Sequence, residues 1–178
     1  MSAVPNERAA LLAKAYAVLS DVTPLRYDCG RLCGAACCAE NDSHGEGEVC
    51  GMLLLPGEKE WLSHEPYTVL PTKEGELLVC SGTCRRDMRP FACRIFPYYP
   101  KITPKGDRFV IDLRPDPRAM GICPILWEKR NRKVRISFLR AAKKAARTLL
   151  RDEEIRKELI AQSEFLSDIE CLRRAYGE

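Results

Sequence analysis

Four thiols lie within ten residues of the sequence, in Cys29-Gly30-Arg31-Leu32-Cys33-Gly34-Ala35-Ala36-Cys37-Cys38. A second group follows as Cys80, Cys84 and Cys93, and Cys123 stands apart from both groups. Structural zinc contributes about 10–16 kcal/mol of folding free energy, enough to hold an irregular chain in place. We therefore expect a small cysteine-rich body that depends on metal as well as on backbone hydrogen bonds.

These eight cysteines are the candidate metal ligands. Soft thiolates select zinc, copper(I) or iron–sulphur clusters, and four of them complete a tetrahedral zinc site. The chain has only two histidines, His44 and His64, so the ligand set must be nearly all sulphur. Eight thiols allow two four-thiolate sites, or one site and a redox pair. The side chains of neighbouring Cys37 and Cys38 point in different directions in any regular backbone. The two residues therefore bind two different metals, or one binds a metal and the other packs in the core.

The cofactor is expected to be zinc or an iron–sulphur cluster, with zinc slightly favoured, because thiolate ligands suit both. The two remaining cysteines, Cys50 and Cys171, are interpreted as small buried hydrophobic residues. No catalytic residue is assigned, since neither histidine has a fixed serine or cysteine partner in the sequence.

The expected compartment is the cytoplasm. No apolar run approaches the 18 or so residues that a membrane helix needs. Near the N-terminus, Glu7, Arg8 and Lys14 interrupt every apolar stretch that a signal peptide would require. Under reducing conditions, clustered thiols bind metal or carry out redox chemistry more often than they pair as disulfides.

The periodicity of apolar residues predicts an α+β fold: a small irregular cysteine-rich body with short strands, an N-terminal helix and a C-terminal helical hairpin. We expect a single metal-binding domain over residues 1–178, with the body at about 25–125 and the C-terminal helices at about 127–176. Helices are predicted at 5–20 and from about 127, where Asp152 caps the last one, and a shorter helix at 29–40 has Asp28 as its candidate N-cap. Strands are predicted at 51–55, 67–70, 76–80 and 109–113, and a helical turn at 58–62. The prolines between Arg89 and Pro124 argue against long regular elements there.

Arginines surround the second cysteine group. Guanidinium groups near Cys84 and Cys93 would lower the pKa of the thiols and donate hydrogen bonds to sulphur. For Arg85 and Arg86, a solvated surface turn is an equally good interpretation, whereas Arg89 and Arg94 bracket Cys93. The formal charge of +4 counts every thiol as neutral, so two zinc sites of four thiolates each would bring the total to about zero.

Taken together, these residues resemble the zinc- or iron-chelating domain family, whose first motif is Cys-x-x-Cys-x-x-Cys-Cys. The second family motif is matched by Arg89-Pro90-Phe91-Ala92-Cys93-Arg94-Ile95-Phe96-Pro97, with Cys84 before it and Cys123 after it. The resemblance covers about residues 29–123, and it departs from the family in the first motif, where both gaps hold three residues. It implies metal chelation. One branch of the family resembles flagellin lysine N-methylases, but no methyl-donor site is present to carry over.

The expected function is therefore a metal-binding protein in which thiolate sites stabilise the body. The alternatives are an iron–sulphur redox protein and an accessory to a protein-modifying, N-methylase-like enzyme. A thiol oxidoreductase is disfavoured because the chain has no Cys-x-x-Cys pair. The basic strip from Trp127 to Arg151 is interpreted as a solvated helix face, so nucleic acid is not an expected partner, and a protein partner is left open.

Overall fold

The fold was analysed in a computed structural model, which describes residues 5–38, 51–62, 68–79, 86–127 and 134–176, with backbone alone at 5, 6, 38 and 127. Its helices are α1 (Pro5–Leu19), α2 (Gly30–Cys33), α3 (Glu58–Trp61), α4 (Phe91–Ile95), α5 (Pro124–Trp127), α6 (Ile136–Leu149) and α7 (Glu153–Tyr176). Three short 3₁₀ helices are η1 (Ala36–Cys38), η2 (Arg86–Met88) and η3 (Pro117–Ala119). The strands are β1 (Gly51–Leu53), β2 (Val69–Thr72), β3 (Gly75–Val79), β4 (Tyr98–Lys105) and β5 (Arg108–Pro115). This mixture of helix and sheet confirms the α+β class.

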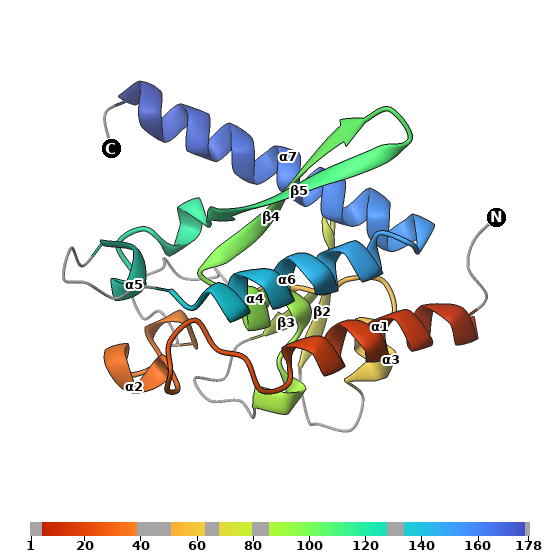
Figure 1. Cartoon of the computed structure of the whole chain (residues 1–178), viewed down its shortest axis with the longest axis horizontal. Coiled ribbons are helices and arrows are strands. Elements are labelled where there is room, and N and C mark those ends of the chain that lie inside the picture. The colour runs from red at the N-terminus through yellow and green to blue at the C-terminus, as the bar shows by residue number, and fades with distance from the viewer. Residues whose placement is uncertain (1–4, 39–50, 63–67, 80–85, 128–133, 177–178) are drawn as a thin grey trace.

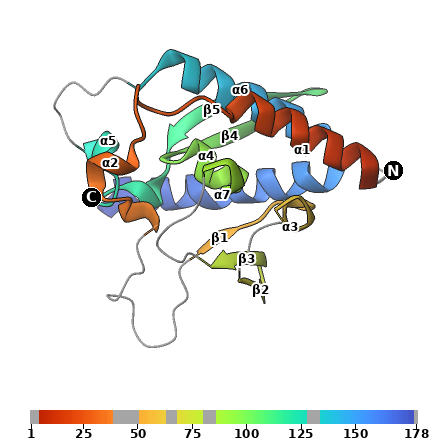
Figure 2. The ribbon, with the colours of Figure 1, turned by 90° about the horizontal axis from the view of Figure 1, so that it is seen from below.

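The elements form layers around a two-stranded ribbon. Strands β4 and β5 pair antiparallel along their whole length, from Tyr98 opposite Pro115 to Lys105 opposite Arg108. Helix α6 contacts β5 and helix α7 contacts β4, so the ribbon lies between the two C-terminal helices (Figures 1 and 2). Helix α1 packs along α6, and a separate antiparallel sheet of order β1-β3-β2 lies next to α4. Within the described ranges, none of the helices combines the length and the apolar character that a membrane span requires.

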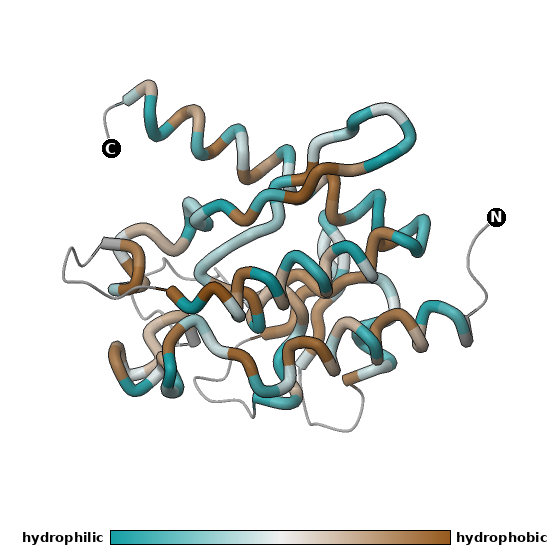
Figure 3. Tube along the Cα trace, in the orientation of Figure 1, coloured by the Kyte–Doolittle hydropathy of each residue, from teal (hydrophilic) through white to brown (hydrophobic). Residues whose placement is uncertain are grey.

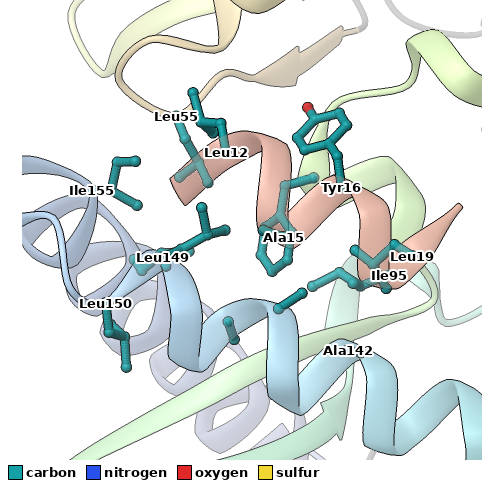
Figure 4. Close-up of a cluster of buried hydrophobic side chains, with 14 of the residues drawn as sticks. Leu12, Ala15, Tyr16, Leu19, Leu55, Ile95, Ala142, Leu149, Leu150 and Ile155 are labelled. Atoms are coloured by element: carbon teal, nitrogen blue, oxygen red, sulfur yellow. The ribbon is translucent and has the colours of Figure 1, made fainter. Parts of the chain in front are cut away.

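The main core lies between α1, α6 and the ribbon. Leu12, Ala15 and Leu19 of α1 face Ala142 and Leu149 of α6, all of them buried (Figure 4). Apolar residues recur along both helices with polar residues between them (Figure 3). Alanines at the contact let the two backbones approach closely, and each buried leucine contributes about 1.5–3 kcal/mol. The buried faces of the first and sixth helices thus form the core.

The start of α7 is fixed by the capping residue that the sequence predicts. Asp152 Oδ1 accepts hydrogen bonds from the backbone N–H groups of Glu154 and Ile155, both at 3.0 Å. The other carboxylate oxygen accepts from Nε of Arg8 at 2.9 Å, which ties α1 to the start of α7. Capping satisfies backbone donors that a helix leaves unpaired. The prediction of a cap at Asp152 is confirmed.

The prediction that prolines forbid long regular elements between Arg89 and Pro124 is wrong. β4 is eight residues long and contains Pro100 and Pro104, opposite Leu113 and Phe109 of β5. In a two-stranded ribbon both strands are edge strands, so half of the N–H groups on each strand make no hydrogen bond to a neighbouring strand. Proline at such a position removes no hydrogen bond between strands. The two prolines are four residues apart, so their missing N–H groups lie on the same side of the strand.

The predicted helix at 29–40 is interrupted. α2 ends at Cys33, and Gly34 and Ala35 both have a left-handed backbone, with φ of 60° and 57°. Left-handed geometry is common at the end of a helix and is unusual for a residue such as alanine. Cys29, Cys33 and Cys37 therefore do not lie on one continuous helix.

Candidate metal centre

Five of the candidate ligands line one cavity. Cys29 and Cys33 come from the ends of α2, Cys37 from η1, Cys93 from α4, and Cys123 from the residue before α5. Figures 1 and 2 both place α2 beside α5, although these helices are far apart in the sequence. The cavity has a volume of about 30 Å³, which is room for about two water molecules. Cysteines from three separate segments of the chain thus line one small cavity.

Local backbone geometry determines where the thiols of Cys29, Cys33 and Cys37 lie. Asp28 Oδ1 accepts the N–H of Gly30 at 3.1 Å at the start of α2, although the residue in the capping position is Cys29. Beyond the left-handed turn, the N–H of Ala35 returns to the carbonyl of Gly30 at 2.9 Å. Cys33 Sγ lies 3.9 Å from the carbonyl oxygen of Cys29. The turn leaves the first two thiols half-buried and exposes Cys37.

Cys123 is buried at the other wall of the cavity. Its N–H donates to the carbonyl of Ala119 at 2.9 Å, and it packs with Leu25 and Ile125 in a small apolar cluster. Burial raises the pKa of the Cys123 thiol, although a hydrogen bond from the backbone N–H of Ile125 acts to lower that pKa. Burial likewise raises the pKa of Cys29, as do the nearby charges of Asp28 and Cys123. An unligated thiol is therefore held in its neutral form here, and a metal would have to displace the proton.

Helix α4, which carries Cys93, is anchored by a buried carboxylate. Glu58 has no exposed surface, and its Oε1 accepts from the backbone N–H of Phe91 at 2.7 Å. The same oxygen accepts from the hydroxyl of Tyr16 at 2.5 Å, and Oε2 accepts from the N–H of Leu55 at 2.8 Å. Burial raises the pKa of Glu58, while these three donors oppose that shift. One side chain thus joins the start of α4 to α1 and to the segment after β1.

Arg94 completes this anchor. Its guanidinium carbon lies 4.2 Å from the centre of the Tyr16 ring, close enough for a cation–π interaction. Its Nε donates to the carbonyl of Arg89 at 2.8 Å, and an Nη donates to the carbonyl of Asp87. Arg94 is buried and lines the cavity beside Cys93.

The cavity wall is cationic. Arg86, Arg89 and Arg94 all line it, and no aspartate or glutamate does so among the residues that the structure describes. The sequence indicated that Arg89 and Arg94 lie near Cys93. For Arg86 it left two interpretations, a residue of the metal site or a solvated residue on a surface turn. The structure puts Arg86 at the cavity, half-buried.

The described part of the chain contains no group of three or more cysteine, histidine or acidic side chains arranged closely enough to hold a metal ion. Cys80 and Cys84 lie outside the described residues, as do Cys50, His44, His64 and the side chain of Cys38. Cys29, Cys33, Cys123 and Cys171 are free thiols. Cys171 is exposed on α7, so its interpretation as a buried residue is wrong.

Sequence reasoning missed the residues that support the site. Glu58 was predicted only as part of a helical turn, and Tyr16 only as part of the N-terminal helix. No local pattern marks a glutamate as buried, since its three donors come from separate segments.

A search for matches found no family model, no curated protein and no solved structure similar to this chain.

Proposed function

We propose that this protein binds a metal ion through the thiolates around the cavity, with zinc favoured over an iron–sulphur cluster. The observation that carries the proposal is that cysteines from three distant segments line one small cavity. Cys29, Cys33, Cys93 and Cys123 are the ligands on which the proposal rests first. Cys37, Cys38, Cys80 and Cys84 remain further candidates from the sequence.

The donor set fits a thiolate-bound metal. Sulphur is the only ligand type that the described cavity offers, since neither a histidine nor a carboxylate lines it. Zinc and iron–sulphur clusters are the usual occupants of all-thiolate sites in a reducing compartment. Four of these thiolates would complete a tetrahedral zinc site, which supports zinc.

The role of such a site is structural. A closed thiolate site fixes segments that have little regular structure of their own, and its binding free energy adds to folding. Here it would join the residues around α2, α4 and α5, which are helices of four or five residues each. We therefore propose a metal-stabilised protein, without an assigned reaction.

The test is metal analysis of protein purified without oxygen, together with its absorption spectrum. One zinc or more per chain, in colourless protein, is the expected result. Iron with sulphide in coloured protein would overturn the choice of zinc and leave the thiolate site standing. Protein that contains neither metal, and that does not take up added Zn²⁺ or Co²⁺, would overturn the proposal.

Single replacements locate the ligands. Cys29→Ser, Cys93→Ser and Cys123→Ser alter one thiol on each of the three segments, and each should lower metal content and melting temperature together. Cys171→Ser is the matched control, because that thiol is exposed on α7. Equal metal content in all four variants would contradict the assignment.

A further inference from the structure

The outward side of α6 carries a row of positive charge. Arg140, Lys144 and Arg147 follow one another at spacings of four and three residues, and Arg151 comes in the turn after the helix. Residues at these spacings lie on one side of a helix. All four side chains are exposed, whereas the opposite side of α6 is buried in the core. Figure 2 shows α6 at one edge of the molecule, so this basic row faces outward.

The carboxylates close to the basic row are paired with other cations. α6 itself contains no aspartate or glutamate. The three carboxylates at positions 152–154 pair with Arg8 or Lys157. Asp112 of β5 pairs with Lys143, which is next to the row in sequence. In the part of the chain that the structure describes, no ion pair involves any of the four cations of the row.

The stability of α6 does not explain this arrangement. Like charges three or four residues apart on a helix repel one another and lower its stability. Cations near the carboxyl end interact favourably with the helix dipole, which accounts for Arg147 and Arg151. The dipole does not account for Arg140, which lies in the second turn of the helix. The basic row therefore favours an anionic partner outside the chain.

The surroundings of the basic row favour the backbone of a nucleic acid duplex over other anionic partners. A helix that lies on a membrane inserts its apolar face among the lipids, but the apolar face of α6 is buried in the core. Proteins that bind single strands stack bases on exposed aromatic side chains. Phe138 is the single aromatic residue of α6, and it is fully buried.

We infer that the basic row binds the phosphate backbone of double-stranded nucleic acid without reading its sequence. Eleven residues separate Arg140 from Arg151, which corresponds to about 16 Å along a helix. Phosphates on one strand of B-DNA follow one another every 3.4 Å or so along the axis, so the row spans about five of them. This inference does not depend on the proposed metal site, which lies in a different part of the fold.

The experiment measures binding of the full chain to short labelled DNA and RNA duplexes by fluorescence anisotropy, at about 50 to 200 mM salt. Four phosphate contacts predict a slope of about −3.6 for log affinity against log salt, which is a loss of about 150-fold over that range. Glutamine at positions 140, 144 and 147 together leaves one contact. That triple variant should bind more weakly at low salt and lose only about 3.5-fold over the same range.

The matched control removes three exposed cations from other elements. Arg31→Gln, Lys73→Gln and Lys105→Gln combined give the same net charge as the triple variant, and this protein should keep the wild-type salt dependence. Glutamine has nearly the helix propensity of lysine and arginine. The triple variant should therefore melt no lower than wild type and contain the same amount of metal.

Three results would overturn the inference. Wild type that binds neither duplex at low salt lacks the proposed surface. Equal losses in the triple variant and in the control would show an effect of net charge alone. Tighter binding to vesicles that contain phosphatidylserine than to either duplex would assign the row to a membrane. Should the triple variant not fold, Lys144→Gln alone should reduce the slope by about 0.9, and an unchanged slope would also overturn the inference. None of these results bears on the metal content, so the proposed function is tested separately.

Discussion

Replacing Glu58 by glutamine tests the anchor that positions α4. The carboxylate is fully buried and accepts three hydrogen bonds, from Tyr16, Phe91 and Leu55, at 2.5, 2.7 and 2.8 Å. Glutamine has nearly the same shape but only one acceptor oxygen. If that oxygen keeps the two bonds made by Oε1, the amide NH₂ must face the N–H of Leu55, donor against donor.

The expected cost follows from that mismatch. A buried donor left without a partner costs about 1–3 kcal/mol. For a chain of this length, each kcal/mol lowers the melting temperature by about 2–4 °C. Glu58→Gln should therefore melt about 2–12 °C lower than wild type. Glu58→Ala orphans all three donors and should cost more than the glutamine variant.

The assay is thermal and urea unfolding followed by circular dichroism on metal-free protein, so that loss of metal does not contribute. Glu76→Gln is the control: Glu76 pairs with Lys59 on the surface, where ion pairs contribute at most about 1 kcal/mol. A double-mutant cycle with Tyr16→Phe should show coupling between the two side chains. Glu58→Gln that unfolds with wild-type stability would refute the view that an ionised carboxylate anchors α4.

The same group makes a prediction about pH. Burial raises the pKa of Glu58 above its ordinary value of 4.5 in spite of the three donors. The folded state then binds this proton more tightly than the unfolded state, so stability falls as pH rises from the ordinary value through the folded one. Glu58→Gln should remove that slope. Parallel pH profiles for the two proteins would contradict the shift.

Three further predictions concern single contacts. Arg8→Met breaks the ion pair with buried Asp152 and should cost about 1.5–3 kcal/mol. Burial acts to raise the pKa of Asp152, but Arg8 and the backbone donors outweigh it, so the pKa is lowered. The stabilisation by this ion pair is therefore present above pH 3.8 and is lost in more acidic solution. The unfolding curves of wild type and variant should converge there. Ser163→Ala removes the buried acceptor of the Ile102 N–H at 2.8 Å and should cost about 1–3 kcal/mol by urea unfolding, whereas an unchanged midpoint would refute that contact. Gly51→Ala would place a Cβ 2.4 Å from a carbonyl oxygen of β3, so amide hydrogen exchange should quicken across β1 and β3 and stay unchanged in the ribbon.

Periodicity predicted the parts of the fold that depend on one helix face or one strand. The apolar stripe of α1 and the cap at Asp152 are local patterns, and both occur as predicted. β4 was missed because prolines oppose strands in general, and the exception depends on the strand having only one neighbour. The number of neighbours is a tertiary property, which the residues of the strand do not encode.

The candidate site also combines local features, which the sequence predicted, with tertiary contacts, which it did not predict. The sequence named Cys29, Cys33, Cys93 and Cys123 among eight candidate ligands. What brings them to one cavity is the core beneath it: Glu58 fixes the start of α4 through donors from three segments, and the left-handed turn at Gly34 redirects the chain after α2. The bonds from Tyr16 and Phe91 to Glu58 join residues far apart in sequence, and the left-handed backbone of Ala35 is unusual for an alanine. A metal ion that binds the thiols would stabilise the arrangement that this buried hub already favours, so metal binding and the Glu58 anchor should reinforce one another in stability.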